Sequence, residues 1–212
     1  MRTAKRREIR RLAALILGLA LAGWAAGCGQ GGGGGGSGGE AVPGAGAAGE
    51  ANSATGWEAG VMELRSGAFQ ANGFLAARHT CAAENLSPPL EWSGAPAGTQ
   101  AFALICEDPD APRGTWDHWL IWNLPATRLG LPEGVPADEV LPDGARQGRN
   151  SGKKTGYSGP CPPPGDPHRY VFRVYALSAP LDLPAGATKS KLLEAMQGRV
   201  LGAGTLVGLF GR

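Results

Sequence analysis

The feature that most limits how this chain can fold is a glycine-rich segment, residues 29–56, which reads GQGGGGGGSGGEAVPGAGAAGEANSATG. It contains 13 glycines and no apolar side chain larger than valine. Such a segment buries too little surface to offset the entropy cost of ordering its backbone. We therefore expect residues 28–56 to be a disordered tether and residues 57–212 to fold as one domain, since 156 residues suffice for a core.

Residues 1–27 have the composition of a secretory signal peptide. The first eleven, MRTAKRREIRR, hold six basic side chains and one acid, and an uncharged apolar run of 15 residues follows at 12–26. That run is shorter than the about 20 residues that a membrane-spanning helix needs. A basic start, a short apolar run and small residues after it predict export to the cell envelope.

The small residues directly before Cys28 resemble a bacterial lipobox, in which the cysteine is lipidated and becomes the first residue of the mature protein. Ala25 stands where a lipobox usually has leucine. Lipidation would anchor the protein firmly to a membrane, because each buried CH₂ of an acyl chain contributes ~0.8 kcal/mol. The alternative is ordinary cleavage, which would give a soluble secreted or periplasmic protein.

The net charge of +2 comes from the N-terminal residues. Without the first eleven residues, 14 basic and 17 acidic side chains are left of the 20 and 18 in the whole chain. A nucleic-acid surface needs an excess of basic side chains. We therefore expect no nucleic-acid partner.

Three cysteines are left once Cys28 is set aside. Export would place them in an oxidising compartment, where one pair can form and one thiol is left over. Cys106 ends an apolar run and is expected to be buried as a small hydrophobic residue. Cys81 and Cys161 lie in loop-like segments and are the favoured disulfide pair, although the sequence does not define the distance between their Cα atoms.

Strands dominate the expected secondary structure. The segment AFALICE (101–107) is a continuous apolar run, as expected for a strand buried on both faces. The segment YVFRVYAL (170–177) alternates with a period of two residues, so its two faces should meet different surroundings. The further strand predictions are residues 61–69, 118–125 and 205–212.

Between the strands the chain is rich in proline and glycine. Residues 85–100 are predicted to be mostly loop, with Leu90 and Trp92 as anchors into the core. One helix is predicted after Thr188 as N-cap, over KSKLLEAMQ, with Gly198 as its stop. The expected architecture is a mainly β, antiparallel sandwich with one or two short helices, of which this one lies near the C-terminus.

Three stretches resemble the phosphatidylethanolamine-binding proteins, with the bacterial Raf kinase inhibitor-like branch as the nearest match. They are NLSPPLEWSGAPAGTQAFAL (85–104), DPDAPRGTWDHW (108–119) and GYSGPCPPPGDPHRYVFRVYAL (156–177). The resemblance runs from about Val61 to Arg212 and implies a Greek-key β-sandwich. It also implies a small anion-binding pocket at one end, which in relatives holds phosphate-like groups and phospholipid head groups.

The resemblance implies nine ligand-binding residues, carried over motif by motif: Asp108, Asp110, Pro112, Trp116, His118, Gly159, Pro160, His168 and Tyr170. Their chemistry suits an anion, because His118 can donate from a ring nitrogen while the tryptophans beside it exclude water. The backbone N–H groups of SGPCPPPG can form a concave donor surface, and its prolines fix the loop before a ligand arrives.

The acidic and aromatic members of this set leave alternatives open. Asp108 either accepts the second ring N–H of His118, which would raise the pKa of that histidine, or meets the ammonium of an ethanolamine-type head group. Asp110 is either a ligand residue or part of an Asx-turn with its own backbone. His168 and Tyr170 are either packing residues or ligand contacts.

Two departures from the family pattern bear on the site. Relatives often have a histidine where this chain has Arg199, and an Asn-Asp-Phe-Gly run where it reads NSGKKTG at 150–156. The loop at 150–156 is therefore expected to pack differently. Its Lys153 and Lys154 either add positive potential at the mouth of the pocket or are simply solvated.

The leading hypothesis is a non-catalytic binding module, without cofactor or bound metal, for a small anionic or phosphorylated ligand or a phospholipid head group. The alternative is a metal-dependent hydrolase that uses Asp108, Asp110, His118 and His168. Against it, the chain has no HExxH motif and no serine in a GxSxG setting. A third possibility is inhibition of a kinase or protease, for which the sequence names no target.

Overall fold

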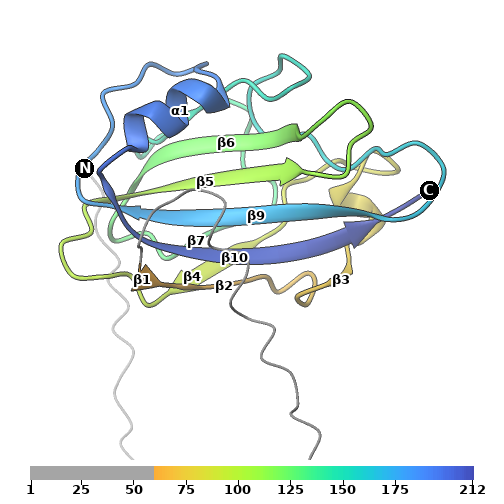
Figure 1. Ribbon diagram of the computed structural model, residues 1–212, viewed down its shortest axis with the longest axis horizontal. Coiled ribbons are helices and arrows are strands. Elements are labelled where there is room, and N and C mark those ends of the chain that lie inside the picture. The colour runs from red at the N-terminus through yellow and green to blue at the C-terminus, as the bar shows by residue number, and fades with distance from the viewer. Residues whose placement is uncertain (1–59) are drawn as a thin grey trace, which may run out of the picture. The chain divides into compact units, whose positions relative to one another are not determined.

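The four longest strands lie side by side in one sheet, in the order β10, β9, β5 and β6 (Figure 1). They belong to the computed structural model of the protein, which describes residues 60–212. The predictions for the signal peptide at 1–27, for Cys28 and for the tether at 28–56 fall outside these residues. Within residues 60–212 no helix is long and apolar enough to cross a membrane.

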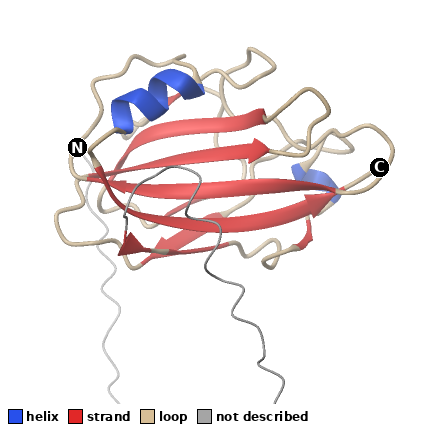
Figure 2. Cartoon of the chain, in the orientation of Figure 1, coloured by secondary structure: helices blue, strands red, loops and turns tan. Residues whose placement is uncertain are grey.

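Two sheets make up the β structure (Figure 2). The large sheet has the order β1 (Gly60–Val61), β10 (Val200–Phe210), β9 (His168–Leu177), β5 (Ala101–Asp108), β6 (Trp116–Pro125) and β8 (Arg146–Gln147), and β3 (Gly73–Phe74) also pairs with β10. The small sheet consists of β2 (Glu63–Arg65), β4 (Leu90–Ser93) and β7 (Gly130–Leu131). A 3-10 helix, η1 (Ala77–His79), and one α-helix, α1 (Lys189–Met196), complete the fold.

The large sheet is buried on both faces. Alternate residues of β9 point into two different apolar clusters, as the period of two predicts. One face contributes Tyr170, Phe172, Val174 and Ala176 to a cluster between the two sheets. The other contributes Tyr175 and Leu177 to a cluster beneath α1. The predicted fold class, a mainly β sandwich with a helix near the C-terminus, is confirmed.

Helix α1 forms where the sequence predicts it and covers the second face of the large sheet. Its buried side chains, Leu192 and Met196, are four residues apart and therefore lie on one side of the helix. They pack in the same cluster as Leu120 and Trp122 of β6. The helix ends before Gly198, whose φ of 70° is the left-handed conformation that glycine adopts at low cost.

The N-terminal strand predicted at 61–69 is wrong as a single element. The chain instead forms β1, which pairs parallel with β10, and β2, which pairs antiparallel with β4 of the small sheet. Strand β2 ends at Arg65, because the Ser66 hydroxyl donates to the Pro89 carbonyl and accepts the N–H of Ala68. These two hydrogen bonds turn the chain. The parallel pairs of β1 and β3 with β10 also make the large sheet mixed rather than purely antiparallel.

The segment predicted to be mostly loop at 85–100 contains the strand β4. Leu90 and Trp92 are buried and lie in the cluster between the sheets, as anticipated for these two anchors. A strand of four residues flanked by proline and glycine is too short to show a periodic pattern. Its pairing with β2 and β7 therefore comes from tertiary packing.

The structure joins Cys81 and Cys161, the two cysteines that the sequence favours as a pair, through a disulfide with Cα atoms 5.4 Å apart. The backbone N–H of Cys81 also donates to the Pro160 carbonyl, at 3.0 Å. Cys106 has a free thiol in the core, and burial raises its pKa well above the usual value. The disulfide therefore ties the segment after η1 to the loop that precedes β9.

Removal of the disulfide, by Cys81→Ala together with Cys161→Ala, is expected to lower the free energy of unfolding by about 4 kcal/mol. The bridge closes a sequence separation of 80 residues, and the chain entropy that it removes from the unfolded state grows with loop length. Urea unfolding followed by tryptophan fluorescence measures the loss. The double variant should not respond to a reductant, whereas a wild-type protein equally stable with and without reductant would contradict this role.

Candidate ligand-binding site

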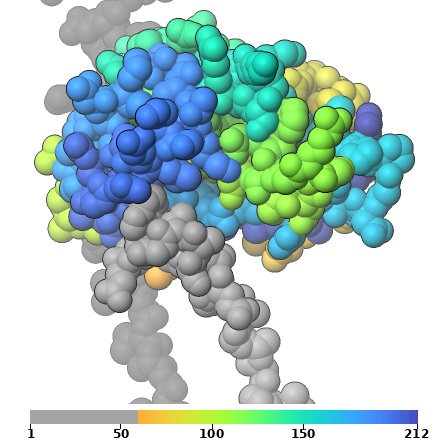
Figure 3. All heavy atoms as spheres, turned by 45° about the horizontal axis from the view of Figure 1, so that its top comes forward, coloured from red at the N-terminus to blue at the C-terminus, as the bar shows by residue number. Residues whose placement is uncertain are grey.

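A cavity of about 220 Å³ lies at one end of the sandwich. Strand β5 ends there, and β6 and β9 begin there, because both are antiparallel neighbours of β5. The residues between β5 and β6 (green in Figure 3) form a surface lobe next to the region of α1 (blue). The cavity is lined by Asp108, Ala111, Pro112, Trp116, His118, Ser158, Gly159, Cys161, Pro162, Pro163 and His168.

His118 reaches this cavity because β6 carries a β-bulge. Cys106 of β5 pairs with Trp119, but the next residue, Glu107, pairs with Asp117, so His118 is an extra residue between two paired ones. A bulge of this kind changes the direction of the side chains around it. It allows His118 to lie on the cavity face although its neighbour Trp119 points into the core on that same face.

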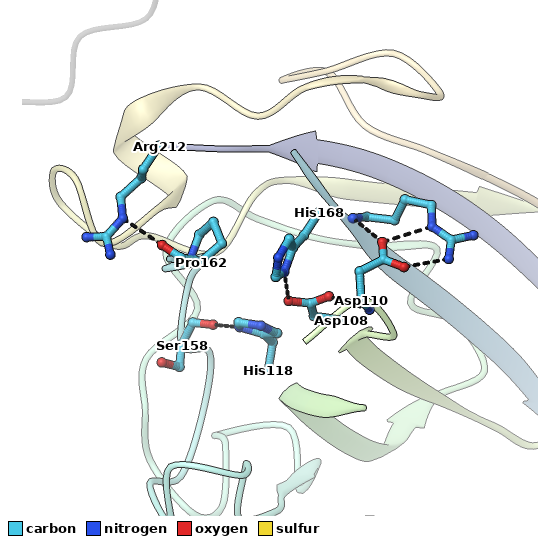
Figure 4. Close-up of polar contacts among 8 residues, drawn as sticks. Asp108, Asp110, His118, Ser158, Pro162, His168 and Arg212 are labelled. Carbon is cyan, nitrogen blue, oxygen red and sulfur yellow. Dashed lines mark hydrogen bonds and ion pairs between the residues drawn. The ribbon is translucent and has the colours of Figure 1, made fainter. Parts of the chain in front are cut away.

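Asp108 pairs with His168 and not with His118 (Figure 4). The Nδ1–H of His168 donates to Oδ2 of Asp108 at 2.7 Å, and Oδ1 accepts the backbone N–H of Asp110 at 2.8 Å. The interpretation in which Asp108 orients His118 is therefore wrong. His168 is more than a packing residue, since it lines the cavity and compensates a carboxylate that is only 4% exposed.

His118 is held by the backbone. Its Nδ1–H donates to the Ser158 carbonyl, and its ring meets the Tyr170 ring edge to face, with the centroids 5.2 Å apart. Burial lowers the pKa of His118 below its usual value, against the opposing effects of the Ser158 carbonyl and the carboxylates of Asp108 and Asp117. The expected rise in this pKa is wrong, and the neutral imidazole has Nε2 as its second, unprotonated nitrogen.

Asp110 does not line the cavity. Its carboxylate accepts the backbone N–H of Arg169 at 2.9 Å and binds the Arg169 guanidinium at 2.9 and 2.6 Å. These hydrogen bonds lower the pKa of Asp110 to about 2. The Asx-turn at this site belongs to Asp108, which accepts the N–H two residues on. Asp110 therefore fixes the turn after β5 from outside.

Tyr170 and Pro160 also lie outside the cavity lining. Tyr170 is fully buried against His118, and within residues 60–212 its hydroxyl has no hydrogen-bond partner. Burial raises the pKa of this hydroxyl, so it stays protonated. The other six residues of the motif-derived set line the cavity: Asp108, Pro112, Trp116, His118, Gly159 and His168.

The loop at 158–163 offers few backbone donors, contrary to the expectation of a concave donor surface. The N–H of Ser158 donates to the His118 carbonyl, and the N–H of Gly159 donates to Asn85 Oδ1 at 2.7 Å. Its three prolines, at 160, 162 and 163, have no N–H. The loop is therefore a preshaped and largely apolar wall.

Neither of the two departures from the family pattern contributes a lining residue to the cavity. The backbone carbonyl of Arg199 accepts the N–H of Ser178, just beyond the end of β9 that lies away from the cavity. The cavity residue His168 is at the other end of β9, where it pairs with Phe210 of β10. In the loop 150–156, Lys153 and Lys154 are exposed and do not line the cavity, which favours the solvated alternative.

The cavity has lining residues that the motif argument did not single out: Ala111, Ser158, Cys161, Pro162 and Pro163. All five lie inside two of the three quoted motifs, 108–119 and 156–177, so the signal was present but not assigned. Arg212 carried no such signal, although its Nε–H donates to the Pro162 carbonyl at 2.7 Å and so supports the wall (Figure 4).

Two sheets packed face to face, with a small end cavity walled by an Asp–His pair, a second histidine and prolines, define a β-sandwich domain with one preshaped site. Residues 65–211 match the family described as Phosphatidylethanolamine-binding protein. The chain therefore belongs to this family, as the resemblance of its motifs implies.

Relatives in other organisms extend this result. The chain is 52% identical over 151 residues to a UPF0098 protein of Methanothermobacter thermautotrophicus, covering 71% of this chain and 99% of the relative. Among solved structures it is similar to the putative family homolog CT736 of Chlamydia trachomatis, with a TM-score of 0.66, 36% identity and coverage of 73% and 99%. It is also similar to Escherichia coli YbcL, with a TM-score of 0.67, 33% identity and coverage of 71% and 98%. The similarity thus extends over whole domains.

The Gly159→Ala substitution is expected to destabilise the protein and displace the cavity wall. A Cβ at this position would lie 2.5 Å from the His79 carbonyl oxygen and 2.7 Å from Asn85 Oδ1, closer than atoms can approach. Overpacking of this kind costs about 1–3 kcal/mol. The free energy of unfolding in urea measures the effect. The matched control is Gly67→Ala, whose Cβ would meet nothing within 4 Å; equal stability of the two variants would contradict the close packing of this wall.

Proposed function

We propose that this domain binds a small phosphorylated or anionic ligand in the cavity at the end of β5 and catalyses no reaction. The observation that carries the proposal is the state of His118, a neutral imidazole whose Nδ1–H is held by the Ser158 carbonyl. Its Nε2 is left without a protein partner among residues 60–212, in a cavity of about 220 Å³. That volume suits a phosphate group or a small head group.

Binding at His118 couples to a proton. A phosphate that carries one proton can donate its O–H to Nε2, or His118 can take up a proton and donate Nε2–H to a dianion. In both cases the complex holds one proton more than neutral His118 and a phosphate dianion hold separately. Since burial lowers the pKa of His118, the free protein does not carry that proton at neutral pH. Affinity for phosphate should therefore rise as the pH falls.

The carboxylate of Asp108 does not exclude an anion from this cavity. It accepts hydrogen bonds from His168 and from the backbone of Asp110, so two of its acceptor positions are already used within the protein. For a ligand with an ammonium group, such as an ethanolamine head group, the same carboxylate offers a counter-charge while His118 meets the phosphate. The edge of Trp116, which is 43% exposed, lies at the mouth and can pack against the ligand.

Inorganic phosphate and phosphoethanolamine are expected to raise the melting temperature of the wild-type protein, more at pH 6 than at pH 8. The gain in stability should follow RT ln(1 + [L]/Kd), about 2.7 kcal/mol at 100 times Kd. His118→Ala should abolish the shift, because it removes the proton acceptor. Thermal shift assays at both pH values measure this, with the exposed-site variant Lys191→Met as control. A shift that survives in His118→Ala would overturn the site assignment.

The same chemistry can come from a free metabolite or from a membrane. The described chain begins at Gly60, which pairs with Gly202 at the opposite end of β10 from Phe210, the partner of His168. The cavity thus lies about 26 Å from that end, at roughly 3.3 Å per strand residue. The expected disordered tether at 28–56 would let the domain turn either end toward a membrane, so binding measurements have to distinguish the two sources. Vesicles of phosphatidylethanolamine that bind more tightly than phosphoethanolamine would favour the head group of a lipid.

The rival function is a metal-dependent hydrolase, because Asp108, His118 and His168 line one cavity. Within residues 60–212, however, no three His, Cys, Asp or Glu side chains are grouped closely enough to hold a metal ion. A chelator should therefore leave the melting temperature unchanged. A drop in melting temperature on adding EDTA that zinc reverses would favour the hydrolase.

We further propose that the protein is a lipoprotein of the Raf kinase inhibitor-like branch, exported and anchored to a membrane through Cys28. The proposal is supported by the basic start, the 15-residue apolar run and the small residues before that cysteine. Expression in a bacterial host, followed by membrane fractionation and mass spectrometry, should find a diacylglyceryl group on Cys28. Cys28→Ser should release the protein from the membrane fraction; a wild-type protein found only in the soluble fraction would favour ordinary cleavage.

A further inference from the structure

A cluster of charged side chains lies on the face of the large sheet that α1 covers, behind the cavity. Lys189, the first residue of α1, places its Nζ 2.8 Å from Glu107 Oε2 and 2.6 Å from Asp117 Oδ1. Glu107 also forms an ion pair with Arg173 of β9. Glu107 and Asp117 each directly adjoin a cavity residue in the chain, namely Asp108 and His118. The cluster therefore borders the site from the opposite face.

The two carboxylates of this cluster need a cation between them. Glu107 and Asp117 are directly opposite each other in the antiparallel pairing of β5 with β6. Like charges in this position destabilise a strand pair. Arg173 reaches only Glu107, whereas Lys189 reaches both. All three members of the Lys189 contact are less than a quarter exposed, so solvent screens them only partly.

The pKa values of the cluster agree with this arrangement. Although burial opposes it, the contacts with Lys189 and Arg173 hold the pKa of Glu107 below its usual value. The two carboxylates likewise raise the pKa of Lys189 against the effect of burial. Glu107 thus stays ionised and the ammonium of Lys189 stays protonated across neutral pH.

The bulge at His118 lies directly beside the pair of Glu107 with Asp117, because the register changes between this pair and the pair of Cys106 with Trp119. In a regular strand Asp117 and Trp119 would share one face, because side chains alternate. Here Asp117 contacts Lys189 on the α1 face, while Trp119 lies in the core between the sheets. The extra residue His118 absorbs this change of face. If β6 had no bulge and Trp119 kept its place in the core, regular alternation would put the His118 side chain on the α1 face, away from the cavity.

We propose that Lys189 is a positioning residue for the ligand cavity. By holding Asp117 opposite Glu107 on the α1 face, it maintains the bulge in β6 and so keeps His118 on the cavity face. The part of this inference that concerns ligand affinity rests on the proposed function; the part that concerns the state of His118 does not.

The test compares Lys189→Met with wild type by two measurements. The first is nitrogen NMR of the His118 ring without ligand at pH 8, where the bond to the Ser158 carbonyl gives an Nδ1–H tautomer signature. The second is affinity for inorganic phosphate. We expect the tautomer signature to be lost or mixed, and phosphate affinity to fall at least tenfold. The indole N–H of Trp119, which donates to Gln147 Oε1 at 2.7 Å, reports whether the fold beside the bulge is intact.

Matched variants separate positioning from general stability. Lys191→Met removes another lysine of α1, one whose contact with Glu194 is exposed, and should change neither readout. Lys189→Arg keeps the cation and should retain the tautomer signature. Lys189→Met with Asp117→Asn also removes the carboxylate that faces Glu107, and it should recover part of the tautomer signature. Lys189→Gln keeps a polar side chain and replaces the methionine variant if that variant does not fold.

Each outcome decides between the two proposals. An unchanged His118 signature and unchanged phosphate affinity in Lys189→Met would overturn the positioning role, as would an equal loss in Lys191→Met. If wild type does not bind phosphate but Lys189→Met still changes the His118 signature, the positioning role stands and the proposed function fails. If wild type binds phosphate and Lys189→Met keeps both the His118 signature and the phosphate affinity, the proposed function stands and the positioning role fails.

Discussion

The pairing of β5 with β6 on one side and β9 on the other is the constraint on which the rest of the structure depends. Asp108 is the last residue of β5, Trp116 is the first of β6 and His168 is the first of β9. Because both pairings are antiparallel, the end of β5 lies beside the starts of β6 and β9, at the same end of the sandwich. The register is secured by burial on both faces, since a slip of one residue would exchange the two apolar sets. The same hydrophobic burial that stabilises the domain therefore assembles its cavity.

The cavity combines compensated charge with a rigid wall. Asp108 has two hydrogen-bond donors within the protein, and His118 spends its Nδ1–H on a backbone carbonyl. Buried polar groups normally need such partners, so the Nε2 of His118 stands out as the atom available to a ligand. The prolines of the loop 158–163 and the disulfide at Cys161 limit its motion before a ligand binds. Little ordering entropy is then lost on binding.

Much of the fold could be predicted from periodicity. The continuous run AFALICE and the alternation in YVFRVYAL both indicate a sheet covered on two sides, and both strands form as expected. The pattern at 61–69 was too weak to show that the chain passes from the large sheet to the small one within a few residues. Short strands such as β4 depend on the neighbours that they pair with, and these neighbours are distant in the sequence.

The sequence by itself determined the family, the two-sided sheet, the helix after Thr188 and the motifs from which the cavity is built, because each depends on residues close together in the chain. Only the tertiary structure decided that Asp108 pairs with His168 and that His118 turns to a backbone carbonyl. His118 and His168 follow Asp108 in the sequence by ten and sixty residues, and these sequence separations do not indicate which ring lies closer to the carboxylate in space. The face on which His118 lies depends on a bulge of one residue, and that bulge is set by energies of strand pairing and charge contact that act across the fold.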